Sequence, residues 1–248
     1  LVAFAAGLVA GAVTGLLHTW MGIPPILSGI LTQLGLWSVN LAIMGMRSNQ
    51  AVSVNQYDLL VSMRYLTDVV KGTRPFYQYP MLTVGLVTLG VILLLYWFFG
   101  TELGSAIRAT GANGNMSRAQ GINTDRMKLV GLVLANGLVG LSGGLYTQYL
   151  GSVTVNMGRG AIVIGLAAVI IGEVLFSKIF RNFALRLVSV VIGAILYYVV
   201  IALVIQLGLN TDDLKLFSAA FVALALFVPH WKQRHAAKAL RKGGKRHA

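Results

Sequence analysis

Three arginines in one polar stretch are the side chains of this sequence best suited to recognising a polar or charged partner. Arg108 and Arg118 lie in the segment Leu103–Ile122, between two long apolar stretches, and Arg126 follows it closely. The segment offers no nucleophile with a base, so its composition favours docking to another protein over catalysis.

The same segment carries the signals of a short helix. Asn113 and Asn115 are favoured N-cap residues, Met116–Gln120 can form a turn or more of helix, and Gly121 can supply a left-handed C-cap. A loop that only joined two membrane helices could be much shorter. We therefore expect a compact helical knob at a membrane surface.

Few polar groups lie inside the apolar stretches. Glu173 is the only acid within or at the edge of one, and Lys178 follows five residues later, which favours a cap or ion pair near the membrane surface over a proton relay. Gln33, Asn40 and Asn136 are neutral amides that could line a pathway, although interhelical hydrogen bonding is their more common role.

Several chemistries are disfavoured. A phosphate-binding GxxxxGK[ST] loop is absent, so the chain is not expected to hydrolyse ATP, and there is no HExxH zinc motif. The sequence has no cysteine and four scattered histidines, which excludes disulfides and gives no ligand cluster for a metal. We therefore expect no directly bound cofactor or metal.

Composition and apolar length predict an all-α, polytopic transmembrane helical bundle. Hydrophobic residues make up 56% of the chain and charged residues 11%. Because the chain starts at Leu1 inside an apolar stretch, without methionine, we expect one or more further N-terminal helices. The seven predicted spans are Leu1–Leu17, Ile26–Met46, Met81–Phe99, Leu129–Leu150, Ala161–Phe176, Leu187–Leu207 and Leu214–Val228.

Glycines and prolines refine this bundle. Gly7, Gly11 and Gly15 repeat at every fourth position, and so do Gly140 and Gly144. Such spacing lets membrane helices approach closely, through ordinary packing or around a pathway. In addition, Pro24 and Pro25 predict a break before the second span.

The distribution of cations predicts the orientation. If the tail 230–248 is cytoplasmic, 14 of the 20 Lys and Arg residues fall on the cytoplasmic side, together with the segment 103–122. The tail holds seven cations and no acid, which favours binding to anionic lipid over nucleic acid. We thus predict a transmembrane domain at 1–229 and a basic cytoplasmic tail.

The outer loop 47–80 is the second unusual connection. Apolar residues recur at helical spacing from Leu59 to Val70, so a short amphipathic helix is expected between Asp58 and Gly72. It could receive a soluble partner, cover a pathway mouth or simply pack against the rim of the bundle.

Four passages resemble the membrane permease subunits of bacterial ABC importers, in the class of branched-chain amino acid and ribose permeases that shares its core fold with the vitamin B12 permease. GSAIRATGANGNMSRAQGI is similar to the family's cytoplasmic coupling segment, and the others are LVLANGLVGLSGGLYTQYLG, GLAAVIIGEVLF and GLLHTWMGIPPILSGILT. In the first passage the matching residues are Arg108, Ala109, Gly111, Asn113, Ala119, Gly121 and Ile122.

The resemblance implies a multi-pass protein of the bacterial cytoplasmic membrane that works in a complex. Two permease copies, expected as a homodimer, would each dock a separate ATP-binding subunit through the coupling segment, and an extracytoplasmic binding protein would deliver the solute. ATP and Mg would be held by the partner subunit. Arg108 and Arg118 would position this contact, while Gly111 and Gly121 would allow its turns.

The cargo and two rival functions stay open at the level of the sequence. An amino acid is the first expectation for the solute, and a nucleoside or sugar is the next. A secondary transporter or channel would use Glu173 to couple transport to protons, and a membrane scaffold would bind partners but move nothing.

Overall fold

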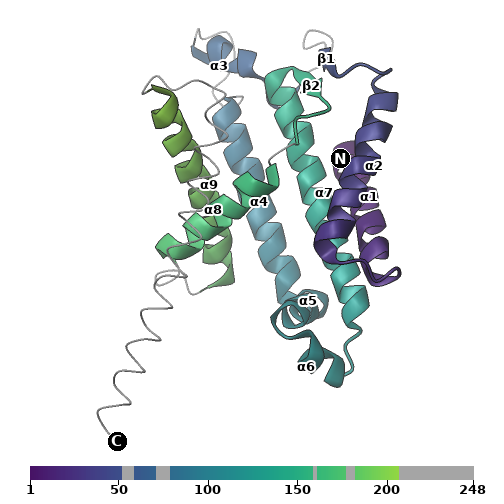
Figure 1. Ribbon diagram of the computed structural model, residues 1–248. Helices are drawn as coiled ribbons and strands as arrows, with labels where there is room; N and C mark the ends of the chain where they lie inside the picture. The colour runs from purple at the N-terminus through teal and green to yellow at the C-terminus, as the bar shows by residue number, and fades with distance from the viewer. Residues whose placement is uncertain (52–58, 71–78, 159–160, 177–181, 207–248) are drawn as a thin grey trace, which may run out of the picture. The chain divides into compact units, whose positions relative to one another are not determined.

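Helices account for most of the structure, a computed structural model that describes residues 1–51, 59–70, 79–158, 161–176 and 182–206 (Figure 1). The chain divides into two compact units, unit 1 (Leu1–Gly158) and unit 2 (Arg159–Ala248), and each is described by itself. Unit 1 contains α1 (Val2–Thr19), α2 (Pro25–Ile43), β1 (Asn49–Ala51), α3 (Met63–Val70), α4 (Pro80–Gly100), α5 (Glu102–Ala112), α6 (Gly114–Ala119), α7 (Thr124–Leu150) and β2 (Ser152–Thr154). Unit 2 contains α8 (Ala161–Phe176) and α9 (Phe183–Gln206).

Five of these helices are long and apolar enough to cross a membrane: α1, α2, α4, α7 and α9. The prediction of an all-α polytopic membrane protein is therefore confirmed. The apolar helix α8 has the predicted bounds but only 16 residues, fewer than the roughly 20 that usually span a bilayer. By contrast, α7 begins five residues before the predicted Leu129, because the Asn123 side chain accepts a hydrogen bond from the N–H of Arg126 and caps the helix there.

Most of the exposed large side chains of these helices are apolar. Large side chains such as Leu93, Leu94 and Trp97 on α4 are more than half exposed, whereas the buried positions of α1 and α2 are glycine, serine and threonine. A protein surrounded by lipid does not need to bury its large apolar side chains. The backbone polar groups of each membrane helix are hydrogen-bonded within that helix. Small residues thus form the helix contacts and large ones face outward.

In unit 1, α1 and α7 pack through glycines on both helices. A Cβ atom placed on Gly11 would lie 2.7 Å from the carbonyl oxygen of Leu132, and one on Gly7 would collide with the carbonyl oxygen of Asn136. From the other helix, a Cβ on Gly140 would collide with the backbone of α1. The predicted glycine repeats therefore form one close interface between helices that are distant in the sequence.

The helices α1 and α2 form a hairpin whose second helix starts at the predicted proline break. Pro24 is the N-cap of α2 and Pro25 its first residue, where proline loses no hydrogen bond. Between the helices, Thr14 Oγ1 donates to Thr32 Oγ1 at 2.9 Å, and Thr32 donates to the carbonyl oxygen of Ser28 at 2.9 Å. One face of α2 is therefore committed to α1.

Opposite the end of unit 1 that carries α5 and α6, two short strands join distant parts of the chain (Figure 1). Strands β1 and β2 pair antiparallel, with Asn49 opposite Thr154 and Ala51 opposite Ser152. This pairing ties the end of α2 to the end of α7. The sequence did not predict it, because three-residue strands are too short to show an alternating pattern.

The predicted amphipathic helix of the outer loop exists but is shorter. It begins at Met63 instead of near Leu59, because the residues before it bond to side chains: the N–H of Leu59 donates to Tyr65 Oη at 3.2 Å, and that of Leu60 to Gln148 Oε1 at 3.2 Å. The second bond fastens the loop to α7.

In unit 2, α8 and α9 also pack through glycines. A Cβ on Gly193 would lie 2.8 Å from the backbone nitrogen of Gly172. Beside this close approach, Ala167 and Tyr197 are buried. The partly buried apolar residues around them are Ile164, Ile171 and Ile201.

Some sequence predictions lie outside the described residues. They are the span Leu214–Val228, the basic tail 230–248, the ion-pair residue Lys178, and the loop-helix limits Asp58 and Gly72.

Candidate functional site

The knob predicted between Leu103 and Ile122 consists of two helices, α5 and α6. The chain turns sharply at Thr101, whose Oγ1 accepts a hydrogen bond from the N–H of Gly104 at 3.3 Å. A Cβ on Gly104 would collide with the carbonyl oxygen of Phe98, so α5 lies directly against the last turn of α4. The sequence predicted only the second of these helices.

Asparagine and glycine set the limits of α6. The Asn113 side chain accepts a hydrogen bond from the N–H of Met116 at 3.1 Å, which is N-cap geometry. At the other end, the N–H of Gly121 donates to the carbonyl of Arg118 and that of Ile122 to the carbonyl of Ser117, both at 3.0 Å. With Gly121 at φ 83°, these two bonds form a Schellman cap. Of the predicted cap residues, Asn113 and Gly121 are confirmed, whereas the helix begins at Gly114, two residues before the predicted Met116.

Arg118 links α6 to the first turn of α7. Its Nη2 and Nε atoms donate to Thr124 Oγ1 at 2.9 and 3.3 Å, and Nη2 lies 3.6 Å from Asp125 Oδ1. Lys128 Nζ lies 3.7 Å from the same carboxylate oxygen. Because the Arg118 side chain is 66% exposed, its ion pair adds little stability, but the buried Thr124 hydroxyl fixes where the guanidinium lies.

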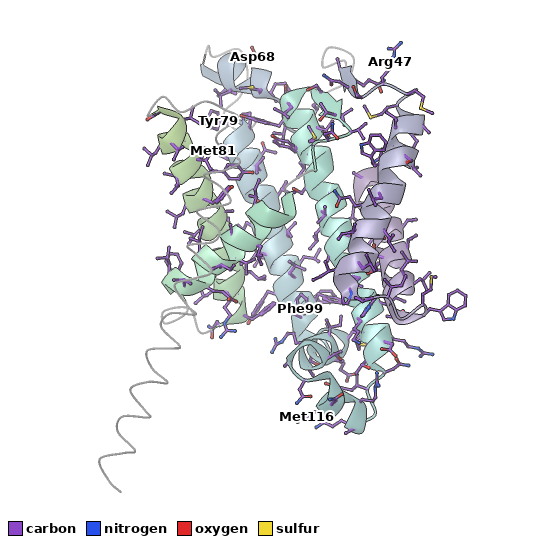
Figure 2. All side chains as sticks on the ribbon, in the orientation of Figure 1. Arg47, Asp68, Tyr79, Met81, Phe99 and Met116 are labelled. Atoms are coloured by element: carbon purple, nitrogen blue, oxygen red, sulfur yellow. The ribbon has the colours of Figure 1, made fainter. Side chains whose placement is uncertain are left out.

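The free end of the knob combines apolar and polar groups. Met116, 58% exposed, lies at the end of unit 1 opposite Arg47 and Tyr79 (Figure 2). The predicted site residues Arg108, Ala109, Asn113, Ala119 and Gly121 are exposed as well, and Ile122 is half-buried. An exposed methionine among small and polar residues suits a protein contact, since methionine adapts to irregular apolar surfaces.

The two glycines expected to permit turns differ. Gly121 has the left-handed conformation that favours glycine, whereas Gly111 lies in the last turn of α5 and a Cβ there would contact nothing. The turn between α5 and α6 is made by Asn113, with φ −154° and ψ 96°. The structure thus uses Asn113 where the sequence analysis expected Gly111.

The three amides inside the spans have different surroundings. Asn136 lies in the α1–α7 contact, where its Nδ2 donates to the carbonyl oxygen of Leu132 at 2.9 Å, which favours a packing role. Gln33 and Asn40 are exposed on α2, and neither side chain has a hydrogen-bond partner among the described residues.

Glu173 is exposed near the end of α8, and the structure describes no ion pair or hydrogen bond of its side chain. Its predicted partner, Lys178, lies outside the described residues. The two predicted roles of Glu173, as a surface ion pair or as a proton relay, both stay predictions.

Two residues that bind the knob from α7 escaped the sequence analysis. Thr124 and Asp125 are the partners of Arg118, and the signal that could have revealed them is the string Asn123-Thr124-Asp125, a favoured N-cap followed by an acid in the first helical turn.

One string in the described part of the chain has the spacing of a catalytic motif but not its structural setting. Gly140 to Gly144 has the spacing of a GxSxG motif, but Ser142 lies in the middle of α7, not at the strand-to-helix turn that such a nucleophile requires. Among the described residues, no three His, Asp or Glu side chains gather into a possible metal site.

Comparison with known proteins gives a consistent result. A family profile described as the permease component of branched-chain amino acid transport systems matches residues 1–228. The tyrosine transport system permease protein of Clostridioides difficile is 34% identical over 231 residues, which cover 90% of this chain and 69% of that protein. The autoinducer 2 import system permease protein LsrC of Yersinia pestis is 26% identical over 176 residues, 70% of this chain and 46% of that protein. No solved structure matches the chain.

Proposed function

The chain belongs to the family of branched-chain amino acid transport system permease components, and on that premise we propose that it carries an amino acid through the cytoplasmic membrane in an ATP-driven importer. The resemblance stated from the sequence is thereby confirmed, and so is the assignment as a transmembrane permease. An amino acid cargo is supported by the family's description and by the tyrosine permease of Clostridioides difficile.

The knob formed by α5 and α6 is the proposed docking site of the ATP-binding subunit, which holds ATP and Mg. Its exposed tip at Met116 and the ordered position of Arg118 support this role. The knob then faces the cytoplasm, as does the C-terminus, in agreement with the distribution of lysine and arginine. A second copy of the permease and an extracytoplasmic binding protein complete the proposed importer, and membrane lipid surrounds it.

The contacts of the knob suggest how it transmits movement. At one end α5 presses against the last turn of α4, and at the other α6 is tied to the first turn of α7 through Arg118 and Thr124. Since α7 is packed backbone to backbone against α1, a displacement of the knob moves α7 and α1 together. In the proposed mechanism, closure of the ATPase pair shifts the knob and tilts these helices around the pathway.

The proposal is tested by placing a charge on the tip of the knob. Met116→Asp is expected to reduce the co-purifying ATP-binding subunit and the ATP-driven uptake at least tenfold, because it puts a hydrated carboxylate into the contact. Met63→Asp on α3 is the matched control for co-purification of the ATP-binding subunit, since Met63 is also 58% exposed but lies at the other end of unit 1. Both are measured by gentle-detergent pull-down and by uptake into proteoliposomes.

Wild-type binding and uptake in the Met116→Asp variant would contradict the docking role. Recovery of the unaltered chain from its native membrane without any ATP-binding subunit would contradict the importer itself.

A further inference from the structure

The helix α2 has a polar and aromatic face that the packing of unit 1 does not explain. Gln33, Trp37 and Asn40 are four and three residues apart, so their side chains share one face of the helix. All three are exposed, Trp37 by 41%. The contact with α1 uses Ser28 and Thr32 instead, about a third of a turn away.

This face is unsuited to lipid. An amide in hydrocarbon without a hydrogen-bond partner is costly, and neither amide has one among the described residues. The neighbouring face of α2 is more apolar, with the exposed side chains of Leu27, Leu31 and Leu34 beside Ser38, whereas Ile30 is an exposed apolar residue next to Gln33. The helix therefore has one side for α1, one for lipid and one that requires a polar environment.

The chemistry of the polar face matches one class of solute. The indole of Trp37 offers a flat apolar surface, and the amides on both sides of it can each donate and accept hydrogen bonds. Residues at this spacing lie close enough on a helix to contact one small molecule together. An amino acid has a carboxylate and an ammonium for the amides, and an aromatic side chain stacks on the indole better than an aliphatic one does.

We propose that Gln33, Trp37 and Asn40 line the translocation pathway and bind an amino acid with an aromatic side chain. The inference rests on the proposed function, and it assigns selectivity to the permease itself: Trp37 stacks on the solute ring, and the two amides hold its polar end.

The absence of cysteine from the sequence allows a direct test of access. Single cysteines replace Gln33 and Asn40 on the polar face, and Leu31 and Leu34 on the apolar face at similar depth. In the complete importer, a charged, water-soluble thiol reagent is expected to modify the first pair at least tenfold faster. Tyrosine is expected to slow that modification more than leucine does.

Equal rates on the two faces would overturn the proposal, because the polar face would then be no better hydrated than the lipid face. Failure of the reagent to modify either cysteine of the polar face would overturn it as well, since the face would then be covered by a second copy of the chain or by another part of it.

Selectivity gives a second readout. With the same binding protein, Trp37→Ala is expected to lower the ratio of tyrosine to leucine uptake at least fivefold, and Trp37→Phe to preserve most of it. Trp97→Ala, at a 72% exposed position of α4, is the control. An unchanged ratio in a transporting Trp37→Ala importer would contradict this inference alone, whereas a wild-type importer that moves no amino acid would contradict the proposed function.

Discussion

At the scale of single residues, the knob depends on one backbone conformation. Gly121 has φ 83° and donates to the carbonyl of Arg118, whereas Gly111 is helical and its surroundings are open. Two glycines in one candidate site thus have different physical roles, and substitution separates them.

Gly121→Ala is expected to destabilise the end of α6 by about 1–2 kcal/mol, because an L-residue resists the left-handed conformation. Gly111→Ala is the control, and it is expected to be neutral or to stabilise α5 by up to about 1 kcal/mol, because alanine is the better helix former. Hydrogen exchange of the amides from Ser117 to Ile122 measures the difference. Equal protection in the two variants would show that the cap does not hold α6.

The sequence predicted the caps of α6 but not the partners of Arg118. Capping is local, so Asn113 and Gly121 are recognisable from a few neighbouring residues. The bond from Arg118 to Thr124 depends on the chain reversing between α6 and α7, and residue types alone do not determine that geometry. The functional roles of these residues stay proposals.

At the scale of elements, close helix packing is the property most sensitive to substitution. The α1–α7 contact brings backbone against backbone at Gly7 and Gly11. The atoms nearest to a Cβ added at either position belong to the backbone of α7, which cannot move aside as a flexible side chain can.

Gly11→Ala is expected to lower the free energy of unfolding by about 1–3 kcal/mol, since its Cβ would lie 2.7 Å from the carbonyl oxygen of Leu132. Gly35→Ala on α2 is the matched control, because a Cβ there would meet nothing within 4 Å. Thermal unfolding in detergent measures both. A Gly11→Ala protein as stable as the control would mean that the helices separate slightly at no cost.

Long apolar stretches predicted the membrane helices well, because length and composition decide whether a helix spans a bilayer. Strands β1 and β2, by contrast, could not be predicted from the sequence, because their three-residue pairing depends on where α2 and α7 end. The helix α5 was missed for a related reason: its polar sequence is held in place by the last turn of α4.

At the scale of the whole molecule, the energy source separates the importer from the rival secondary transporter. The described part of the chain offers Glu173 as an acid within the apolar helix α8, where this residue is exposed. An importer driven by a partner ATPase does not need it to carry protons.

Glu173→Gln is therefore expected to keep ATP-driven uptake within about twofold of wild type. The measurement is uptake into proteoliposomes with the ATP-binding subunit, with and without a proton gradient. The secondary transporter would instead be supported if wild-type uptake depends on the proton gradient and Glu173→Gln loses both the uptake and this dependence.

The packing of α1 against α7 also sets an order for biosynthesis. The two helices meet through residues about 120 positions apart, which at about 5–20 residues per second take about 6–24 s to translate. During that interval the glycine face of α1 has no α7 to pack against. In the same way, β1 is made before the strand β2 with which it pairs. A chain that stalls before α7 thus leaves α1 without the helix that it packs against most closely.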